Sequence, residues 1–519
     1  MKPAALAVLV GLALGVAAPA GAAGTEPPAR FAVVLGYNGG APDPRAPLAF
    51  ADDDAARFFL QVLPGVERAF LLTTFDKQSA RLFGELTETA QPPTRRELSR
   101  VLGEVSWLVR EARERGRETE LVFYFAGHGD VSDGGEGFVV LADGPFTRTE
   151  LQRQVVEASP ADTNHVLLDA CASYFMVARG DESGQVPLSP DLLDVLSGER
   201  REQGTDASAW SRTGTLVSTS SAAEVHESAE LGGGVFSYLL RSALAGAADA
   251  DADGRVEYAE AAGFISSASG SLKDPRARLS VHAEAPAQRP HTPLADLSAS
   301  GADRFLVVDG QAPVHLRILD AAGVPYAELH KDQGPRALIA LVGNPFYVVQ
   351  RGEEEAVLVP RAAGAYALSS LRFQPAARPR GSGAGPFEAL FQEPFGAAYL
   401  RGFLSSSGLV PPRTRGTLPI AWATGGEPPF RFPFLETGAA AFVGAGVLAG
   451  GAALCAGMSL AGFATLEERF GKTGEIDPGV AFEVEAWRAG ANAAAVGAVV
   501  LGLTGAALVG GELLSEEGP

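Results

Sequence analysis

The sequence predicts an α/β protein with a mostly parallel sheet flanked by helices, followed by a small β-rich domain and two C-terminal transmembrane helices. Three patterns lead to this prediction. Short apolar runs alternate with amphipathic helical stretches over residues 30–285. Several short strands separated by turns fill residues 300–375, and two long apolar runs without charge follow.

In the first region, strands are expected where short runs of Val, Leu, Phe and Ala carry little charge. Helices are expected where apolar residues recur every three or four positions. Their alternation implies parallel strands joined by helices that cover both faces of the sheet. The expected strands are residues 31–36, 120–126, 138–142, 165–170 and 214–219, and the expected helices are residues 51–63, 98–112, 151–158 and 236–247.

The remaining segments of the soluble part are richer in turn-forming residues. Residues 176–212 are polar and predict a long surface loop. Residues 286–293 are rich in proline and predict a linker to the β-rich domain. Residues 376–436 are rich in Pro, Gly and Arg, and we expect them to form a loosely packed juxtamembrane segment.

Both ends of the chain predict an association with a membrane. Residues 1–23 have the features of a signal peptide, because a lysine precedes a short apolar stretch and small residues form a cleavage site. Residues 437–466 and 489–511 each reach the length of about 20 apolar residues that a membrane helix needs. The alternatives are a retained N-terminal anchor and a buried soluble hairpin in place of the two spans.

Basic residues between the two spans predict their orientation. This loop carries Arg469, Lys472 and Arg488, whereas the short tail after the second span has no Lys or Arg. Positively charged loops tend to stay in the cytoplasm. We therefore expect an inner-membrane protein whose large N-terminal part lies on the extracytoplasmic, periplasmic side.

Charge and cysteine content narrow the possible partners and bonds. The formal net charge of −20 disfavours nucleic acid as a partner, because a phosphate-binding face needs clustered Lys and Arg. The chain has only two cysteines, so a disulfide framework is not expected. Cys455 lies in an apolar run, where it is expected to be a small buried residue. Cys171 is then the one thiol of the soluble part.

Two chemically active side chains follow predicted strands. His128 lies between two glycines after the strand at 120–126, and Cys171 directly follows the strand at 165–170. Because parallel strands end at the same edge of a sheet, these side chains can meet in one crevice. A histidine can accept the proton of a thiol, and the N–H of Gly129 can stabilise an oxyanion. Taken singly, the cysteine could be a core residue and the histidine part of a turn. A zinc site is less favoured, since no second cysteine is near.

In these motifs the chain resembles the caspase/metacaspase family of cysteine peptidases. The resemblance covers about residues 31–280, and its elements come in the family's order: a strand, an Asp-Ala helix start, His-Gly, Asp-x-Cys, a loop, a strand and a Phe-Ser-Tyr helix. Cys171 comes 43 residues after His128, close to the spacing of this family. The resemblance implies a caspase-like peptidase domain at residues 30–285, with Cys171 as nucleophile and His128 as its base.

The resemblance also implies a preference for basic substrates. In metacaspases an acidic pair in the S1 pocket selects Arg or Lys at P1, and a carboxylate pair suits a guanidinium. Asp169 matches one member by its place before Cys171, and Asp54 looks like the other. The alternative for the acidic run at residues 52–54 is a helix N-cap. Metacaspases often have Ser two residues before the histidine, where this chain has Ala126, a difference that would alter the shape of S1 and not its charge.

The implied function is a cysteine endopeptidase that cuts protein or peptide substrates after Arg or Lys through a Cys–His dyad. The N–H groups of Gly129 and Cys171 would bind the oxyanion. The alternative is a catalytically silent caspase-fold protein that acts as a membrane-anchored interaction or sensor protein. An enzyme with this specificity could process itself in the long loop, at Arg179, Arg200, Arg201 and Arg212.

Residues 249–260 match the EF-hand loop pattern at every fixed position. In such a loop, side-chain oxygens and one backbone carbonyl surround a Ca²⁺ ion. The alternative is a solvated acidic helix–turn–helix, because the loop is single. Calcium stimulation of the enzyme is a separate hypothesis. The expected ligands are Asp249, Asp251, Asp253 and Glu260, with Arg255 providing its carbonyl.

Overall fold

The computed structural model describes residues 26–40, 45–170, 174–177, 210–218, 227–272, 279, 281–376 and 389–423. The predicted signal peptide and both predicted spans lie outside these residues. Within the described part, no helix is both long enough and apolar enough to cross a membrane.

A six-stranded sheet forms the centre of the first region, in the order β12-β8-β7-β3-β1-β2. Five of its strands are parallel, and only β12 runs antiparallel to its neighbour β8. The prediction of a mostly parallel sheet is therefore confirmed. The strands are β1 (Ala29–Tyr37), β2 (Arg68–Thr73), β3 (Thr119–Gly127), β7 (Thr163–Asp169), β8 (Thr213–Ser218) and β12 (Val281–Glu284).

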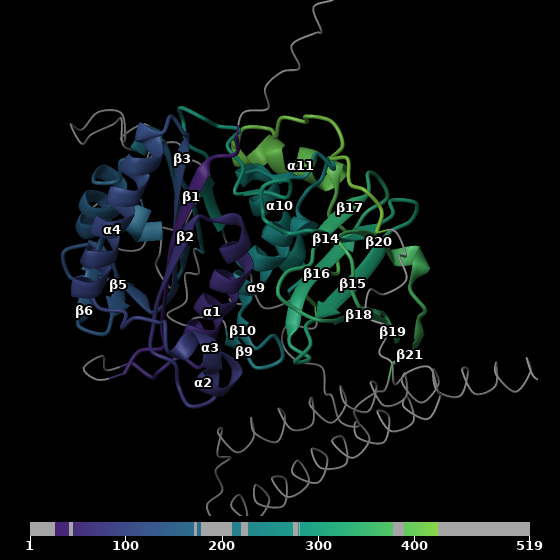
Figure 1. Ribbon diagram of the computed structural model, residues 1–519, viewed down its shortest axis with the longest axis horizontal. Helices are drawn as coiled ribbons and strands as arrows, with labels where there is room; N and C mark the ends of the chain where they lie inside the picture. Colours follow the sequence, from purple (N-terminus) through teal and green to yellow (C-terminus); the bar gives the residue numbers. More distant parts are fainter. Residues whose placement is uncertain are drawn as a thin grey trace, which may run out of the picture.

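Helices cover both faces of this sheet, with α4 on one side and α1, α9 and α10 on the other (Figure 1). The side chains of β1 alternate between the two faces: Phe31 and Val33 join the core under α4, whereas Ala32 and Val34 join the core on the other side. Burial on both faces explains why the strands are nearly continuous apolar runs. The helices are α1 (Ala51–Val62), α4 (Arg95–Glu114), α9 (Val235–Ser242) and α10 (Tyr258–Gly270).

Smaller elements surround the sheet. The strand expected at residues 138–142 forms, but it belongs to a separate antiparallel sheet, and β2 at the edge of the main sheet was not predicted. The helix expected at residues 236–247 ends its regular part at Ser242, and a helical turn follows (Ala243–Ala247). Gly246 has φ 111° there, and a Cβ on it would lie 2.0 Å from the Leu338 carbonyl oxygen. The other elements are α2 (Ser79–Leu82), α3 (Gly84–Thr87), α5 (Arg148–Leu151) with a helical turn (Gln152–Glu157), α6 (Tyr174–Val177), β4 (Gly129–Val131), β5 (Gly137–Leu141), β6 (Gly144–Thr147), β9 (Glu227–Ser228), β10 (Gly233–Gly234), β11 (Arg255–Val256) and β13 (Ala295–Asp296).

The β-rich region forms two sheets, β17-β14-β20 and β16-β15-β18-β19-β21, as short strands separated by turns. Its core is continuous with that of α9 and α10. Glu328 of β16 links the two regions: it accepts a hydrogen bond from the Tyr238 hydroxyl at 2.7 Å, and its N–H donates to Ser242 Oγ. The strands are β14 (Arg304–Val308), β15 (Val314–Leu319), β16 (Pro325–Lys331), β17 (Ala337–Ala340), β18 (Tyr347–Arg351), β19 (Glu354–Leu358), β20 (Gly364–Ala367) and β21 (Gln374–Pro375).

The beginning of the described C-terminal segment is more tightly packed than expected. Phe391, Phe395 and Leu400 are buried, and α11 (Ala397–Ser407) packs against α10. Phe264 of α10 contacts both phenylalanine rings, at centroid distances of 5.8 and 5.5 Å. The expectation of loose packing is therefore wrong for residues 389–400, because their aromatic side chains complete the core over α10.

A largely buried ion pair joins the neighbouring strands β1 and β3 at their amino ends. Glu120 of β3 accepts a hydrogen bond from Arg30 Nε of β1 at 2.8 Å, and His165 Nε2 lies 3.5 Å from the same carboxylate. His165 Nδ1 is 2.6 Å from the Tyr258 hydroxyl. Burial alone would raise the pKa of Glu120, but Arg30 and His165 outweigh it and lower this pKa to about 2.

Glu120→Gln should lower the free energy of unfolding by about 2–3 kcal/mol at pH 7, because Arg30 loses its counter-charge in a largely buried site. The folded-state pKa lies below the ordinary value of 4.5, so the contribution of Glu120 is complete above that pH and is lost as the pH falls toward about 2. Denaturant unfolding at pH 7 and at pH 3 measures both effects.

The matched control is Glu104→Gln, which removes an exposed partner of Arg100 and should cost less than about 0.5 kcal/mol. A stability difference between Glu120→Gln and the wild type that is as large at pH 3 as at pH 7 would contradict the role given to the ionised carboxylate.

Candidate functional site

The two strands that precede the predicted dyad are neighbours in the sheet. β3 and β7 run parallel, and Ala126 is paired with Asp169. His128 lies two residues beyond Ala126, at the carboxyl end of its strand. Cys171 itself lies outside the described residues, directly after Ala170. The structure therefore brings the predicted base and the Asp-x-Cys strand to the same edge of the sheet.

The backbone around His128 is shaped by glycine. Gly127 has φ +154°, and a Cβ on it would lie 2.7 Å from the Phe125 ring. A Cβ on Gly39 would lie 3.1 Å from His128 Cδ2, so the loop after β1 packs directly against the imidazole. The half-buried ring is thus held between β3 and this loop.

His128 also has a backbone partner that favours one tautomer of the neutral ring. Its Nε2 lies 3.0 Å from the carbonyl oxygen of Ala46. A carbonyl can only accept, so Nε2 carries the proton in this contact, and Nδ1 is the basic nitrogen of the neutral ring. No sequence pattern pointed to Ala46.

Gly129 begins β4, which pairs antiparallel with β5. The N–H of Val140 donates to the carbonyl oxygen of His128 at 2.9 Å, so the Gly129–Val139 pair is of the non-hydrogen-bonded kind. This pairing does not use the N–H of Gly129. An amide in that position can serve as a donor to a developing oxyanion.

The structure brings the two predicted carboxylates together at the start of α9. Asp54 Oδ2 accepts the N–H of Gly234 at 2.7 Å, and Asp169 Oδ2 accepts the N–H of Ser237 at 3.0 Å as well as its hydroxyl. A Cβ on Gly234 would lie 2.9 Å from Asp169 Oδ2 and 3.0 Å from Asp54 Oδ2. Both carboxylates therefore flank a position where only glycine fits without displacement.

Burial governs the charge of this pair. It raises the pKa of Asp169 to about 6, and it raises the pKa of Asp54 well above its usual range, with the charge of Asp169 adding to the effect. The guanidinium of Arg241, itself buried, partly offsets the shift at Asp54. Asp54 Oδ1 is buried and has no hydrogen-bond partner among the described residues. A cation at this oxygen would favour the ionised state.

Both carboxylates are nearly inaccessible, with exposed fractions of 2% for Asp54 and 6% for Asp169. They also take the role of N-caps for α9, which has glycine at its own N-cap position. The site therefore combines a structural use of these acids with an unmet oxygen that could bind a guanidinium.

The acidic run at residues 52–54 does not cap its own helix in the expected way. The N-cap residue of α1 is Phe50, whose N–H donates to Glu227 Oε1 at 2.8 Å, while the N–H of Ala49 donates to Oε2. Asp52 accepts the N–H of Asp53 at 2.9 Å. Sequence reasoning missed Glu227 and Gly234, and it included Ser237 only within the Phe-Ser-Tyr helix, without a role. The three glycines before α9 were a further visible signal.

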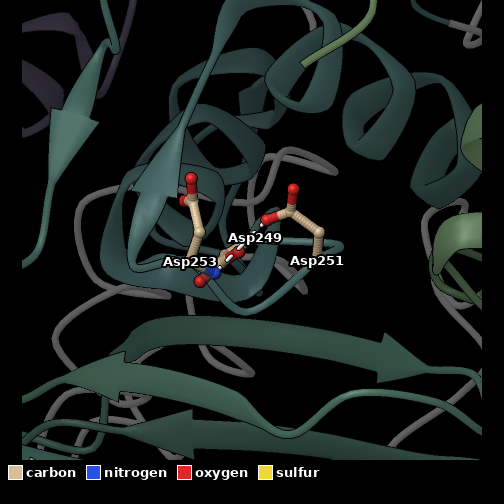
Figure 2. A group of neighbouring side chains, drawn as sticks. All are labelled: Asp249, Asp251 and Asp253. Carbon is tan, nitrogen blue, oxygen red and sulfur yellow. Dashed lines mark hydrogen bonds between the residues drawn. The ribbon is translucent and has the colours of Figure 1, made fainter. Parts of the chain in front are cut away.

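The predicted calcium loop lies between the helical turn Ala243–Ala247 and α10, so the expected helix–loop–helix is present. Asp249, Asp251 and Asp253 each offer an oxygen within 4.8 Å of the others (Figure 2). Gly254, at the sixth position, has φ +83° and makes the sharp turn that this pattern requires. Val256, at the eighth position, pairs with Ala295 of β13, so the strand that follows the predicted linker provides a partner for the single loop.

The donor set fits a cation in part. Asp249 is 5% exposed, and its Oδ1 has no hydrogen-bond partner among the described residues, while Oδ2 accepts the N–H of Gly254 at 2.9 Å. Burial and the neighbouring carboxylates raise its pKa to about 7. Glu260 instead accepts the N–H groups of Ala250 and Glu257, so it is a helix cap in this arrangement and stands outside the group of three. The carbonyl of Arg255 lies between those of Gly254 and Val256, which accept the N–H groups of Leu297 and Leu294.

Of the four predicted self-processing sites, only Arg212 is described. Its guanidinium donates to the carbonyl oxygens of Ser159 and Ala161, and its own carbonyl accepts the N–H of Asn164. Cleavage after this residue would have to break these contacts first.

Comparisons with known proteins give little further information. No family model and no curated protein matches the chain. Among solved structures, the crystal structure of protein GSU0716 from Geobacter sulfurreducens is similar to 50% of this chain and 93% of its own, with 15% sequence identity and a TM-score of 0.28. A likeness at this level carries no argument.

Gly234→Ala should lower the free energy of unfolding by about 1–3 kcal/mol, because the new methyl group would displace two buried carboxylates from the start of α9. The backbone angles at Gly234 (φ −67°, ψ 139°) are open to alanine, so the cost is steric. Gly103→Ala, in open space on α4, should raise stability by about 0.4–1 kcal/mol. Chemical unfolding compares the two; equal stabilities would contradict the close approach.

Proposed function

We propose that this chain is a caspase/metacaspase-like cysteine endopeptidase that hydrolyses peptide bonds after Arg or Lys. Cys171 is its nucleophile and His128 its base, with Asp54 and Asp169 binding the basic P1 side chain. The single observation that carries the proposal is the pairing of Ala126 with Asp169, which brings the two predicted catalytic motifs to neighbouring strand ends.

The contacts of His128 support its role as a base. Since the Ala46 carbonyl holds the proton on Nε2, Nδ1 can accept the proton of a thiol. The Ala46 carbonyl is then the positioning group, in place of a carboxylate. It orients the ring without stabilising a full imidazolium charge as a carboxylate would.

The reaction would proceed in two acyl transfers. Nδ1 of His128 takes the proton of the Cys171 thiol, and Sγ attacks the scissile carbonyl carbon, forming an oxyanion that the N–H groups of Gly129 and Cys171 bind. As the C–N bond breaks, the leaving amine takes the proton from the imidazole. Water then hydrolyses the thioester with His128 again as base, which releases the acid and restores the thiol.

The proximity of the Asp54 and Asp169 carboxylates favours a basic P1 residue. Asp54 Oδ1 is the unmet acceptor beside Asp169, and a guanidinium would replace the hydration that burial has removed. We further propose that the peptidase is membrane-anchored on the extracytoplasmic side, with protein or peptide substrates and no nucleic acid as partners. The charge of −20 suits basic substrates.

The second candidate function is the catalytically silent interaction or sensor protein. It is favoured by the near-complete burial of Asp54 and Asp169 and by their use as caps for α9. In that case both acids would be structural, and peptides with basic residues would not be turned over.

Hydrolysis of peptides with Arg, Lys or Asp at P1 separates the two functions. We expect turnover of the Arg and Lys peptides only. Cys171→Ala and His128→Ala should each lower kcat/KM by at least about 100-fold. Asp169→Asn should lower kcat/KM for the Arg peptide by about 10- to 100-fold, the value of a charge-assisted hydrogen bond.

The matched control is Asp133→Asn, which removes an exposed carboxylate from the turn after β4 and should leave kcat/KM unchanged. Turnover that survives Cys171→Ala would rule out the nucleophile. Absence of turnover on all three peptides by a folded wild-type protein would leave the silent interaction protein as the function.

We also propose that residues 249–260 bind Ca²⁺. The observation that favours this second role is the buried, unpartnered Asp249 Oδ1 beside two further carboxylates. Asp249, Asp251 and Asp253 would provide side-chain oxygens and Arg255 its carbonyl, while Glu260 would have to leave its N–H partners to join them. A bound divalent cation would offset the mutual repulsion of these acids.

Ca²⁺ should stabilise the folded chain by about 2.7 kcal/mol when its concentration is 100 times the dissociation constant. Asp249→Asn should weaken Ca²⁺ binding at least about tenfold, because it removes a buried charge from the ligand set. Isothermal titration and Ca²⁺-dependent unfolding measure these effects, with Asp309→Asn on the β-rich region as the control. Equal Ca²⁺ affinities in the Asp249→Asn variant and the wild type would exclude this loop as the site.

A further inference from the structure

An extended segment after α11 lies across the acidic loop. We name residues 411–418 the strap. The N–H of Leu418 donates to the Ala252 carbonyl at 3.1 Å, and the N–H of Arg413 donates to Glu257 Oε1 at 3.2 Å. A Cβ on Gly254 would lie 2.6 Å from the Leu418 side chain, so the strap is in direct contact with the turn of the loop.

The strap donates hydrogen bonds to carboxylate oxygens that accept none from the loop's own backbone amides. Asp251 Oδ1 accepts the N–H of Asp253 within the loop, whereas Oδ2 accepts the Thr414 hydroxyl at 2.5 Å. Asp253 Oδ1 accepts the N–H of Arg255, whereas Oδ2 accepts the N–H of Arg415 at 3.2 Å. Figure 2 shows the three aspartates on the turn, and its dashed line is the bond inside the loop.

In each of the three aspartates, one carboxylate oxygen accepts an N–H of the loop and the other does not. Asp249 Oδ1 is unmet, and the other two, on Asp251 and Asp253, meet the strap. If the hydrogen bonds from the loop's backbone amides persist when a cation binds, these three oxygens remain available as its ligands.

We propose that the strap competes with Ca²⁺ for the acidic loop, so that calcium binding releases the strap and the strap in turn lowers calcium affinity. This inference rests on the calcium loop proposed above and adds its regulation. The same carboxylate oxygens would bind either Ca²⁺, a divalent cation that prefers oxygen ligands, or the hydrogens of the Thr414 hydroxyl and the Arg415 amide.

Electrostatics makes the two occupants exclusive. A Ca²⁺ ion sits 2.3–2.6 Å from its oxygen ligands. The partly positive hydrogens of Thr414 and Arg415 point at the same two carboxylate oxygens and would face the ion across that distance. The strap also carries two arginines, Arg413 and Arg415, whose formal charges complement the acidic loop only while no cation is bound. Because binding free energies are linked, each occupant weakens the other by the same factor.

Calcium titration of Thr414 variants of the full chain tests the competition, with Cys171→Ala in every protein to prevent self-cleavage. Thr414→Ala removes the hydroxyl donor and should tighten Ca²⁺ binding by about three- to tenfold. Thr414→Ser keeps the hydroxyl and should match the wild type. Thr417→Ala, an exposed threonine of the same strap, is the matched control and should also match it.

Limited trypsin digestion supplies a readout that does not depend on affinity. Trypsin can cut after Arg413 and Arg415, and both bonds lie in the strap. Ca²⁺ should speed these two cuts several-fold in the wild type, as the strap leaves the loop. At a Ca²⁺ concentration near the wild-type dissociation constant, Asp249→Asn should show little acceleration, because its weakened site would be mostly empty.

The outcomes separate this proposal from the calcium site itself. Weaker binding by Thr414→Ala would mean that the hydroxyl is a ligand, and unchanged binding would mean no competition; both overturn the proposal while the calcium loop stands. Ca²⁺ binding to the Thr414→Ala variant but not to the wild type would support the proposal, because the strap would then fully exclude Ca²⁺ from the wild-type loop. Absence of binding in both proteins would overturn the strap and the calcium loop together.

Discussion

The register between β3 and β7 is the constraint on which the candidate active site depends. Ala126 lies opposite Asp169, and residues on both strands are buried on both faces of the sheet. A slip of one residue would turn every side chain of a strand to the opposite face, so this register is strongly specified by the two cores. It fixes where His128 leaves its strand and where Asp169 reaches α9. The core, and not the local motif, thus sets the positions of the reactive groups.

A second theme is the use of buried acids at helix starts. Asp169 accepts an N–H from α9, Glu227 accepts one before α1, and Glu260 accepts the N–H of Glu257 at the start of α10. Asp169 and Glu260 are buried and Glu227 is half-buried, and burial raises the pKa of all three. Such groups are stabilised by helix amides but remain receptive to a cation. The proposed guanidinium site contains one such acid, Asp169, and the proposed calcium loop contains another, Glu260.

The regions after the sheet are parts of one packed body. The β-rich strands share a core with α9 and α10, and Glu328 ties them to the helix that carries Ser237. Phe391 and Phe395 then close the far side of α10. A change at the acidic loop therefore meets well-packed neighbours on most sides. The strap, which is extended and largely exposed, is the neighbour that can move at least cost.

The sequence by itself determined what depends on neighbours along the chain: the alternating strands and helices, the strand-end positions of His128 and Cys171, and the aspartate spacing of the acidic loop. Periodicity and local turn chemistry record such features directly. Only the tertiary structure decided which distant groups meet. Asp54 reaches Gly234 across 180 residues, and Thr414 reaches Asp251 across 163. Edge strand β2 also escaped prediction. These contacts depend on how whole layers pack, and no local pattern in one sequence encodes that.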